Sequence, residues 1–398
     1  MADPCVMKTY AGFGWKSGFY DSSMPFRLDT WSNCIYGCLY CGASFRKALS
    51  RSKELYMSGD IRGLDLEKLK QAAGGTYRNF FLNRKRVQMG TLADPFPPIE
   101  MEEGVTLECL KWLDEMEMPL TICTKSVWWV CEWEYIQLFH KNRKRWNVQF
   151  SFGATSDELA AKLEPQAPNV SAKLASVFTL ENFGIETIAR FRPLIPTSAA
   201  VEPRRELLRK LREKGCRKAR AHILGYDFRS EPFRKDWPAL VDACGTSSAV
   251  LKTWTENHAD GSYGPFVWPA MELLKEECKD LGIEISVSPV CGKYEDQLEI
   301  LTKPPALDTF RGRWSSAVGI AHEKGSVSLE DIEPLIEETF GDSPAGTMGM
   351  SGLSAREALR IWWNTPTRPN SPSSKYPNFL FPGRLDNNGC QIYNFRRK

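Results

Sequence analysis

Residues 33–41 read NCIYGCLYC and place three cysteines, Cys34, Cys38 and Cys41, in a C-x3-C-x2-C pattern. The pattern follows residues 26–30, the first predicted strand. Three thiolates on one compact loop can converge on a single metal centre. Zinc would need a fourth protein ligand, and no nearby cysteine or histidine completes a second pair. A cubane [4Fe–4S] cluster fits better, because three protein thiolates leave one of its irons open for a small molecule.

The composition is that of a folded protein that contains metal or free thiols. The chain has 398 residues, of which 42% are hydrophobic and 25% charged, and its net charge is +3. This length fits one large α/β domain with an accessory part, or two medium domains, and the apolar fraction excludes wholesale disorder. Four histidines argue against a histidine-rich metal site, whereas twelve cysteines supply many thiols.

The sequence predicts a cytoplasmic location and no membrane partner. The first residues, MADPCVMKTYAGFG, lack the basic-then-apolar pattern of a signal peptide. No apolar run approaches the ~20 residues that a membrane-spanning helix needs. In a reducing cytosol the cysteines are better interpreted as thiols or metal ligands than as disulfides.

Short strand-like runs alternate with longer amphipathic segments. The predicted strands are residues 26–30, 86–90, 120–124, 147–152, 185–194, 217–224 and 283–287. The predicted helices include residues 64–73, 101–116, 132–141, 170–183, 204–214 and 269–281. Alternating βα units indicate a parallel sheet with right-handed crossovers. Because no GxGxxG follows the first strand, we expect the α/β class with a partial (β/α)6-type TIM barrel over residues 26–305, after an N-terminal extension of residues 1–25.

The pattern changes after about residue 305. Residues 328–340 are predicted to form a helix, and the capping box from Ser354 to Glu357 opens another that ends at Trp362 and Trp363. The Pro/Ser/Asn-rich stretch that follows predicts an extended loop. We therefore expect residues 306–398 to be a mainly helical or irregular C-terminal appendage. The two tryptophans either offer a stacking surface to bases or pack inside the appendage and hold it together, and the second interpretation is favoured.

The cysteine pattern resembles that of the radical S-adenosylmethionine (SAM) superfamily. The resemblance implies a [4Fe–4S] cluster on Cys34, Cys38 and Cys41, with the amino and carboxylate groups of SAM on the open iron. It also implies that an external one-electron reductant drives cleavage of SAM to a 5′-deoxyadenosyl radical, which abstracts hydrogen from substrate. Tyr40 matches the aromatic residue that in this family precedes the third cysteine and packs beside the adenine.

Further motifs resemble those of the spore photoproduct lyase-like branch of this superfamily. Residues 90–100, GTLADPFPPIE, resemble the signature TDPYQPxE but depart from it at Ala93, Phe96 and Pro97. Three other matches are Thr124-Lys125-Ser126 to "TKS", residues 163–168 (LEPQAP) to "LEPxAP", and residues 192–196 (RPLIP) to the end of strand 5. The matches cover residues 26–200, so they support the chemistry well and the substrate only weakly.

Alternation along the strands then assigns side chains to the lumen of the barrel. In this branch the lysine of TKS points to the SAM carboxylate, and the position of Ser151 also lies near the amino-acid part of SAM. We assign Tyr40, Lys125, Ser151 and Arg192 to cofactor binding. Cys123 shares the face of Lys125.

The polar faces of the last three barrel strands also belong to the lumen, because the outer face lies under helices and must be apolar. These faces carry Arg190 and Arg192, then Lys218, Arg220 and His222, then Glu284 and Ser286. Such a lumen suits an anionic or hydrogen-bonding ligand, and we assign Arg190, Arg220 and Glu284 to substrate binding. Structural pairing of some arginines with acidic residues at the barrel floor is the alternative.

Two residues are candidates for chemistry. Cys123 could return a hydrogen atom to a product radical, because a thiol S–H bond is weak, although a buried structural cysteine is common. His222 could act as an acid or base or hold a phosphate.

Three functions compete. The first is a radical SAM enzyme, of lyase or isomerase type, that acts on a thymine-derived base of DNA, with base modification slightly favoured over photoproduct-type repair. Basic clusters at residues 84–86, 141–145, 214–220 and 396–398 fit a DNA partner, or are solvated surface. The second is a radical SAM enzyme for a small molecule or peptide. The third is a non-catalytic metal-binding module that contacts nucleic acid.

Overall fold

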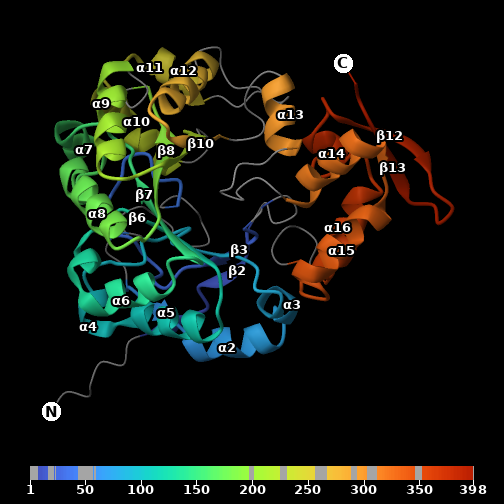
Figure 1. The fold of residues 1–398 in the computed structure, drawn as a ribbon, viewed down its shortest axis with the longest axis horizontal. Coiled ribbons are helices and arrows are strands. Elements are labelled where there is room, and N and C mark those ends of the chain that lie inside the picture. The colour runs from blue at the N-terminus through green and yellow to red at the C-terminus, as the bar shows by residue number, and fades with distance from the viewer. Residues whose placement is uncertain are drawn as a thin grey trace.

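An eight-stranded sheet forms the centre of the molecule (Figure 1). The computed structural model describes residues 8–16, 22, 24–43, 57, 60–196, 201–224, 231–255, 267–287, 294–302, 312–345 and 352–397. In sheet order the strands are β10 (Glu284–Val287), β9 (Lys218–Ile223), β8 (Thr187–Leu194), β7 (Trp146–Ser151), β6 (Leu120–Thr124), β5 (Val87–Met89), β3 (Phe26–Leu28) and β2 (Phe13–Trp15). Only the β2–β3 pair is antiparallel in this sheet. All seven predicted strands are confirmed, with shifts of one or two residues at their ends.

The sheet is open, which confirms an α/β partial barrel. From β3 to β10 the strand order follows the chain, so each parallel strand lies beside the previous strand of the sheet. Among the described residues, β2 and β10 are the two edges and are not paired with each other. A separate two-stranded parallel sheet joins β1 (Thr9–Tyr10) to β4 (Gly63–Leu64).

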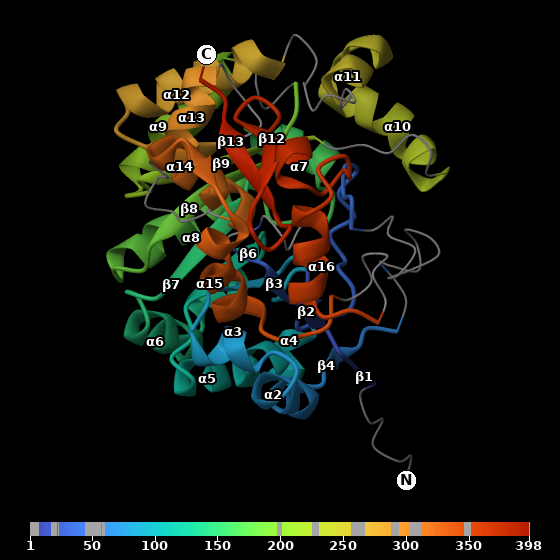
Figure 2. The same ribbon diagram turned by 90° about the vertical axis from the view of Figure 1, so that its right-hand side faces the viewer.

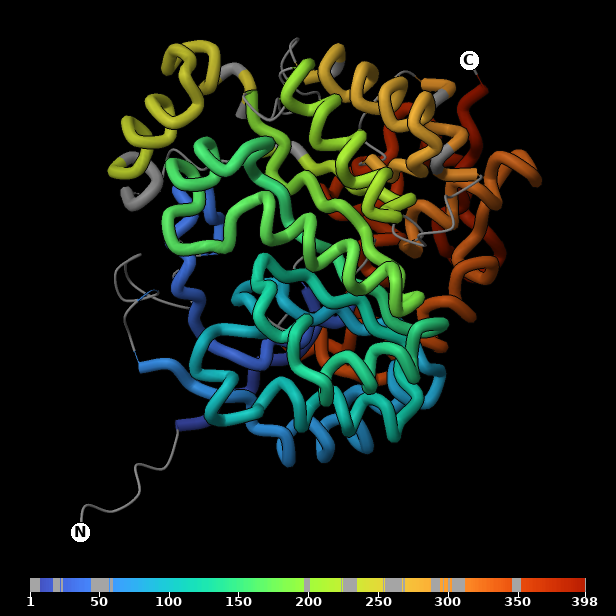
Figure 3. Tube along the Cα trace, turned by 60° about the vertical axis from the view of Figure 1, so that its left-hand side comes forward, coloured from blue at the N-terminus to red at the C-terminus, as the bar shows by residue number. Residues whose placement is uncertain are grey.

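Helices cover the outer face of the sheet. Figures 1 and 3 show α5, α6, α8 and α9 on the side away from the C-terminal elements. The helices of this part are α2 (Leu66–Gly74), α3 (Arg78–Leu82), α4 (Glu100–Glu103), α5 (Val105–Glu115), the 3-10 helix η2 (Trp128–Cys131), α6 (Trp133–Lys141), α7 (Asp157–Leu163), α8 (Val170–Asn182), α9 (Val201–Glu213), α10 (Glu231–Cys244), α11 (Ser248–Thr255) and α12 (Val267–Asp280). No helix in the described ranges is both long enough and apolar enough to cross a membrane.

Turn residues set the ends of these helices. The predicted helix over residues 101–116 is instead two helices, because Gly104 between α4 and α5 has a φ of +63°. Gly184 and Gly282 have φ of +69° and +65° just after α8 and α12, where glycine is the preferred residue. The side chain of Asn169 caps α8 by accepting a hydrogen bond from the backbone N–H of Ala172.

Polar side chains face the lumen in layers, as the alternation predicts. Ser151, Arg190, Arg220 and Ser286 are neighbours in register on β7, β8, β9 and β10, and all four are buried. Residues offset by one on the same strands, such as Ala189 and Ala219, are buried and apolar. The lumen is therefore a polar interior enclosed by an apolar shell.

The C-terminal part has its own core. Its elements are α13 (Tyr294–Thr302), α14 (Arg313–Lys324), β11 (Ser326–Val327), α15 (Leu329–Phe340), α16 (Ala355–Trp363), α17 (Pro372–Lys375), β12 (Leu380–Leu385) and β13 (Gln391–Phe395). The three strands pair in the order β11-β13-β12, an antiparallel sheet that the sequence did not predict. Helix α13 contributes Leu301 to this core, although it precedes residue 306.

The tryptophan pair belongs to this core. Trp362 and Trp363 are 3% and 0% exposed. The indole N–H of Trp363 donates to the carbonyl of Gln391 at 2.6 Å, and its ring lies 5.5 Å from that of Trp314. The hypothesis that the pair stacks on bases is therefore wrong, because neither indole face is accessible. The capping box is confirmed, since the Ser354 N–H and hydroxyl both donate to Glu357.

Strand β2 and helix α3 contact the C-terminal part, and Figure 2 shows α3 beside α15. The indole N–H of Trp15 donates to the hydroxyl of Ser343 at 3.1 Å, and its ring lies 4.9 Å from that of Phe340. Asn79 and Asn83 donate to backbone carbonyls at the end of α15. The C-terminal part is thus packed against the sheet and α3.

Changing Trp15 to Ala tests this junction. We expect the free energy of unfolding to fall by about 3 kcal/mol, because the ring packs edge-on against Phe26, Phe80 and Phe340. Urea denaturation of the two proteins measures the difference. The control is Trp133→Ala, because Trp133 is 62% exposed and its loss should change stability by less than about 0.5 kcal/mol. Equal stability of the Trp15 variant and the parent would contradict the assignment.

Candidate functional site

A cavity of about 390 Å³ opens at the carboxyl ends of the parallel strands. The candidate residues that line it are Cys34, Cys38, Tyr40, Cys41, Cys123, Lys125, Ser151, Arg190, Arg192 and His222. Substrate sites of parallel α/β barrels lie at this edge, because the loops that follow the strands converge there. The structure thus brings the cysteine loop, the residues assigned to SAM and both candidates for chemistry together.

Two predicted substrate residues lie elsewhere. Arg220 is buried and in register with Arg190, although it is absent from the lining of the cavity. Glu284 is the first residue of β10 and pairs in register with Lys218, in the layer beneath Arg220. Side chains at the amino end of a strand point to the floor of the barrel, so the structure does not bring Glu284 to the cavity.

The cysteine loop is fixed by backbone contacts. The N–H of Leu39 donates to the carbonyl of Leu163 at 3.0 Å, and that of Gln166 donates to the carbonyl of Tyr36. Gly37 has a φ of +62°, and a Cβ there would meet the side chain of Met57. Residues 163–168 (LEPQAP) therefore hold the cysteine loop in place through these two backbone hydrogen bonds.

The three thiols are largely protected from water. Cys38 is buried, whereas Cys34 and Cys41 are half-buried. Burial raises the pKa of Cys34 to about 12 and also raises that of Cys38. Without a metal the thiols of Cys34 and Cys38 hold their protons at neutral pH, so metal binding there must release protons.

The donor set fits an iron–sulfur cluster. Within the described ranges, no three histidine, cysteine or acidic side chains lie close enough to hold a single metal ion. A cubane has a different requirement, because each thiolate binds a different iron at a different corner. Cys34, Cys38 and Cys41 line one cavity together with Lys125 and Ser151, so these three thiolates would hold such a cluster there.

Asp94 joins two of the sequence motifs. Its carboxylate accepts hydrogen bonds from the hydroxyl of Thr124 at 2.9 Å and from the backbone N–H of Lys125 at 2.7 Å. It also accepts from the N–H of Phe96 at 3.1 Å. Burial raises the pKa of Asp94, while these donors lower it. Asp94 thereby sets the position from which Lys125 enters the cavity.

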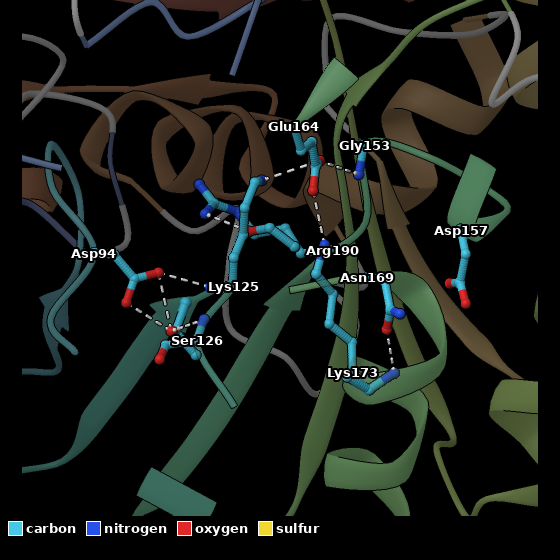
Figure 4. A network of polar contacts seen from close by, with 12 residues as sticks. Asp94, Lys125, Ser126, Gly153, Asp157, Glu164, Asn169, Lys173 and Arg190 are labelled. Atoms are coloured by element: carbon cyan, nitrogen blue, oxygen red, sulfur yellow. Dashed lines mark hydrogen bonds and ion pairs between the residues drawn. The ribbon is translucent and has the colours of Figure 1, made fainter. Parts of the chain in front are cut away.

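Glu164 is the hub of the polar network in Figure 4. Its fully buried carboxylate accepts from Lys173 Nζ at 2.7 Å and the backbone N–H of Gly153 at 3.2 Å, and lies 3.4 Å from Lys125 Nζ. The phenol of Tyr40 donates to the same carboxylate. Burial raises the pKa of Glu164, but the two lysines outweigh it and hold this pKa at about 2. Glu164 is therefore ionised at neutral pH.

This network positions two of the residues assigned to SAM. Lys125 Nζ also lies 5.4 Å from the centre of the Tyr40 ring, a cation–π contact. A Cβ on Gly153 would meet both the Tyr40 hydroxyl and the Glu164 carboxylate, so only glycine fits there. Glu164 and Asp94 were visible in the sequence as motif residues, but their partners were not.

Cys123 is held between two amides. The Nε2 of Gln88 donates to the sulfur at 3.2 Å, and the thiol donates to Oε1 of Gln149 at 3.6 Å. Lys16 in turn donates to Oε1 of Gln88. A thiol that donates one hydrogen bond and accepts another has a fixed S–H direction.

Cationic side chains line the part of the lumen next to Cys123. Arg190 Nη1 donates to the hydroxyl of Ser151 at 3.5 Å. Burial and the positive charges of Arg220, Arg192, Arg190 and Lys16 lower the pKa of His222 well below its usual range, so the imidazole is neutral at pH 7. Lys16 had no signal in the sequence, because only the pairing of β2 with β3 brings it to this place.

The surface basic clusters are partly neutralised. Arg84 Nη2 lies 2.5 Å from Glu117, and Lys85 Nζ lies 2.6 Å from Glu338. Lys141 likewise pairs with Asp114 at 2.6 Å. These contacts favour the interpretation of these clusters as ordinary surface.

Solved structures resemble this fold. Neither a protein-family model nor a curated protein matches the chain. A mutant of spore photoproduct lyase has 13% identity and a TM-score of 0.50, over 67% of this chain and 77% of its own. Another lyase mutant, with bound AdoMet and dinucleoside spore photoproduct, has 12% identity and a TM-score of 0.47, over 66% and 76%. Streptococcus suis SuiB bound to precursor peptide SuiA has 11% identity and a TM-score of 0.45, over 94% and 71%.

The chain therefore has a fold similar to that of spore photoproduct lyase. This similarity agrees with the motifs between residues 26 and 200. At such low identity the likeness concerns the fold alone.

Changing Glu164 to Gln tests the buried network. We expect the free energy of unfolding at pH 7 to fall by about 3–5 kcal/mol, because fully buried Lys173 loses its carboxylate partner. Since folding lowers the pKa of Glu164 from 4.5 to about 2, its stabilisation is complete above pH 4.5 and is lost as the pH falls toward 2. The variant should therefore lose less stability than the parent between pH 5 and pH 3.

Urea denaturation across this pH range measures both effects. Glu102→Gln removes an exposed carboxylate and is the matched control, with a change below about 0.5 kcal/mol. Parallel pH profiles for the parent and the Glu164 variant would contradict a buried, ionised carboxylate.

Proposed function

We propose that this chain is a radical SAM enzyme that acts on a thymine-derived base of DNA. The observation that carries the proposal is the convergence of the three loop cysteines with Lys125 and Ser151 on one cavity. A non-catalytic metal module would have no use for a polar cavity beside its metal. The same convergence supports a [4Fe–4S] cluster and SAM as cofactors.

The residues of the chain have distinct tasks in this proposal. Cys34, Cys38 and Cys41 hold the cluster, while Tyr40, Lys125, Ser151 and Arg192 hold SAM. When bound, the cluster would supply the one-electron reduction that cleaves SAM to a 5′-deoxyadenosyl radical, with an external one-electron reductant as the source of the electron. The half-buried cysteine loop keeps bulk water away from this chemistry.

The substrate assignment is supported by the shape and charge of the site. A base that reacts inside a cavity must leave the stack, which is least costly in single-stranded DNA. Cationic and hydrogen-bonding groups in the lumen suit a pyrimidine that carries an anionic group. Departures from TDPYQPxE and the additional C-terminal core favour base modification, of lyase or isomerase type, over photoproduct repair.

Cluster assembly gives the first test. After anaerobic reconstitution we expect about four irons per chain in the parent and almost none in Cys38→Ala. The control is Cys131→Ala, which removes an exposed thiol of η2 outside the cavity. With dithionite, the parent and the control should release 5′-deoxyadenosine from SAM, and thymine-containing single-stranded DNA should increase that rate.

The outcomes separate the three functions. An iron-free parent protein would contradict the radical mechanism and favour a binding module. If no thymine-containing DNA, native or modified, changes the rate of SAM cleavage, this result would contradict a DNA substrate and favour a small molecule or peptide.

We further propose that Cys123 is the hydrogen-atom donor and that neutral His222 serves as a hydrogen-bonding acid or base beside it. The S–H bond of Cys123 breaks homolytically, the hydrogen atom forms a C–H bond with the product radical, and a thiyl radical remains. One electron from the external reductant and one proton from solvent restore the thiol. The hydrogen bonds to Gln88 and Gln149 support this role, because they orient the S–H bond.

Changing Cys123 to Ala should therefore leave the iron content and the cleavage of SAM intact, while product formation falls at least about tenfold. In D2O the parent should place deuterium from the exchangeable thiol into the product, and the variant should not. Mass spectrometry of the product measures both effects. Cys109→Ala, which removes another buried thiol, is the control and should retain deuterium transfer. Loss of the cluster in the Cys123 variant would refute the donor role.

A further inference from the structure

A cluster of basic side chains, of which His222 is neutral at pH 7, surrounds the part of the lumen beside Cys123. Arg190 and His222 line the cavity, and Arg220 is buried next to Arg190 in the same layer of the sheet. Lys16 arrives from the opposite end of the open sheet, directly after β2, and contacts Gln88 on β5. The two ends of the sheet thus bring positive charges to the same place.

These cations repel one another. Burial and the field of Arg190 lower the pKa of Arg220 to about 10. Burial, together with the charges of Arg220, Arg192 and Arg190, lowers that of Lys16. Like charges gathered in a poorly solvated interior destabilise the protein unless an anion accompanies them.

The side chain of Arg190 has room for another hydrogen bond. It is 8% exposed and lines the cavity, and its Nε has no hydrogen-bond partner, although Nη1 contacts Ser151. The Nε2 of His222 also lacks a partner on the same wall. A guanidinium that lines a cavity and has an N–H group without a hydrogen-bond partner is suited to an oxyanion.

Arg190 and Lys125 have different partners in the cavity. Lys125 Nζ lies 3.4 Å from Glu164, whereas Arg190 Nη1 donates to Ser151, and the charges of the two residues are close enough to interact. Cys123 lines the same cavity, and its thiol bonds to Gln149 of β7 and to Gln88, which Lys16 contacts.

We propose that the substrate carries an oxyanion, a phosphate or a carboxylate, that binds Arg190 and His222 with Arg220 and Lys16 behind them. This inference rests on the proposed function and names the chemical class of its substrate. An anion bound there would share the cavity with the thiol of Cys123. A nucleotide would supply the anion as its own phosphate, and a modified base would supply it as a carboxylate.

Three probes test the proposal with the reconstituted holoenzyme. Isothermal titration calorimetry measures the affinities of thymidine, thymidine 5′-monophosphate and 5-carboxy-2′-deoxyuridine. We expect at least one of the two anionic probes to bind about tenfold or more tightly than thymidine, because the added bond is charge-assisted. The tighter of the two anionic probes identifies the source of the oxyanion.

Variants then assign the effect to Arg190. Arg190→Gln should abolish the preference for the anionic probe, and Arg190→Lys should retain most of it. Arg217→Gln also removes one positive charge, but from an exposed position just before the amino end of β9. This control variant should bind the probes as the parent does. If Arg190→Lys retains its affinity for the anionic probe, the loss of affinity in Arg190→Gln is not caused by a general failure to fold.

Equal affinities for all three probes would overturn the inference. So would a loss of SAM affinity in Arg190→Gln with unchanged affinity for the anionic probe, since Arg190 would then serve the cofactor. Neither readout requires turnover. An absent cluster or absent cleavage of SAM would contradict the proposed function, while the affinity of the protein for the anionic probe would still be measurable.

Discussion

The buried carboxylate of Glu164 is the constraint on which the candidate site depends. It holds the phenol of Tyr40 on the cysteine loop, the backbone N–H of Gly153 after β7, and the ammonium groups of Lys125 and Lys173. Four separate segments are therefore fixed by one side chain. A single charge can do this in a dry interior because each donor partly compensates its desolvation.

The second constraint is the openness of the sheet. Within the described part of the chain β2 and β10 are edges that do not pair with each other, and the lumen between them is lined by polar residues rather than filled by an apolar core. The cost is a concentration of basic groups around Cys123, where burial and neighbouring positive charges lower the pKa values of Lys16 and His222. A ligand that brings negative charge into this lumen would relieve that repulsion, which connects the stability of the fold to occupancy of the site.

Most of the fold was predictable, because the strands and helices follow local periodicity. The lumen-facing residues from Cys123 to His222 were also predictable, since side chains alternate along strands. Glu284 shows the limit of that argument: alternation gives the face of the sheet but not the height along the strand, which depends on register with β9. The tryptophans of α16 show another limit, because their burial depends on β13, a strand with no clear signal in the sequence.

By itself the sequence determined the order of the strands, the cysteine loop, the capping of several helices and the polar face of each strand. These properties depend on residues close together in the chain, whose spacing sets turns and periodicity. The tertiary structure decided which distant residues meet. Lys16 lies within the electrostatic field of Arg220. Tyr40 donates a hydrogen bond to Glu164, and Trp15 donates one to Ser343. Such contacts follow from the curvature of the sheet and the packing of the C-terminal core, which no local pattern encodes.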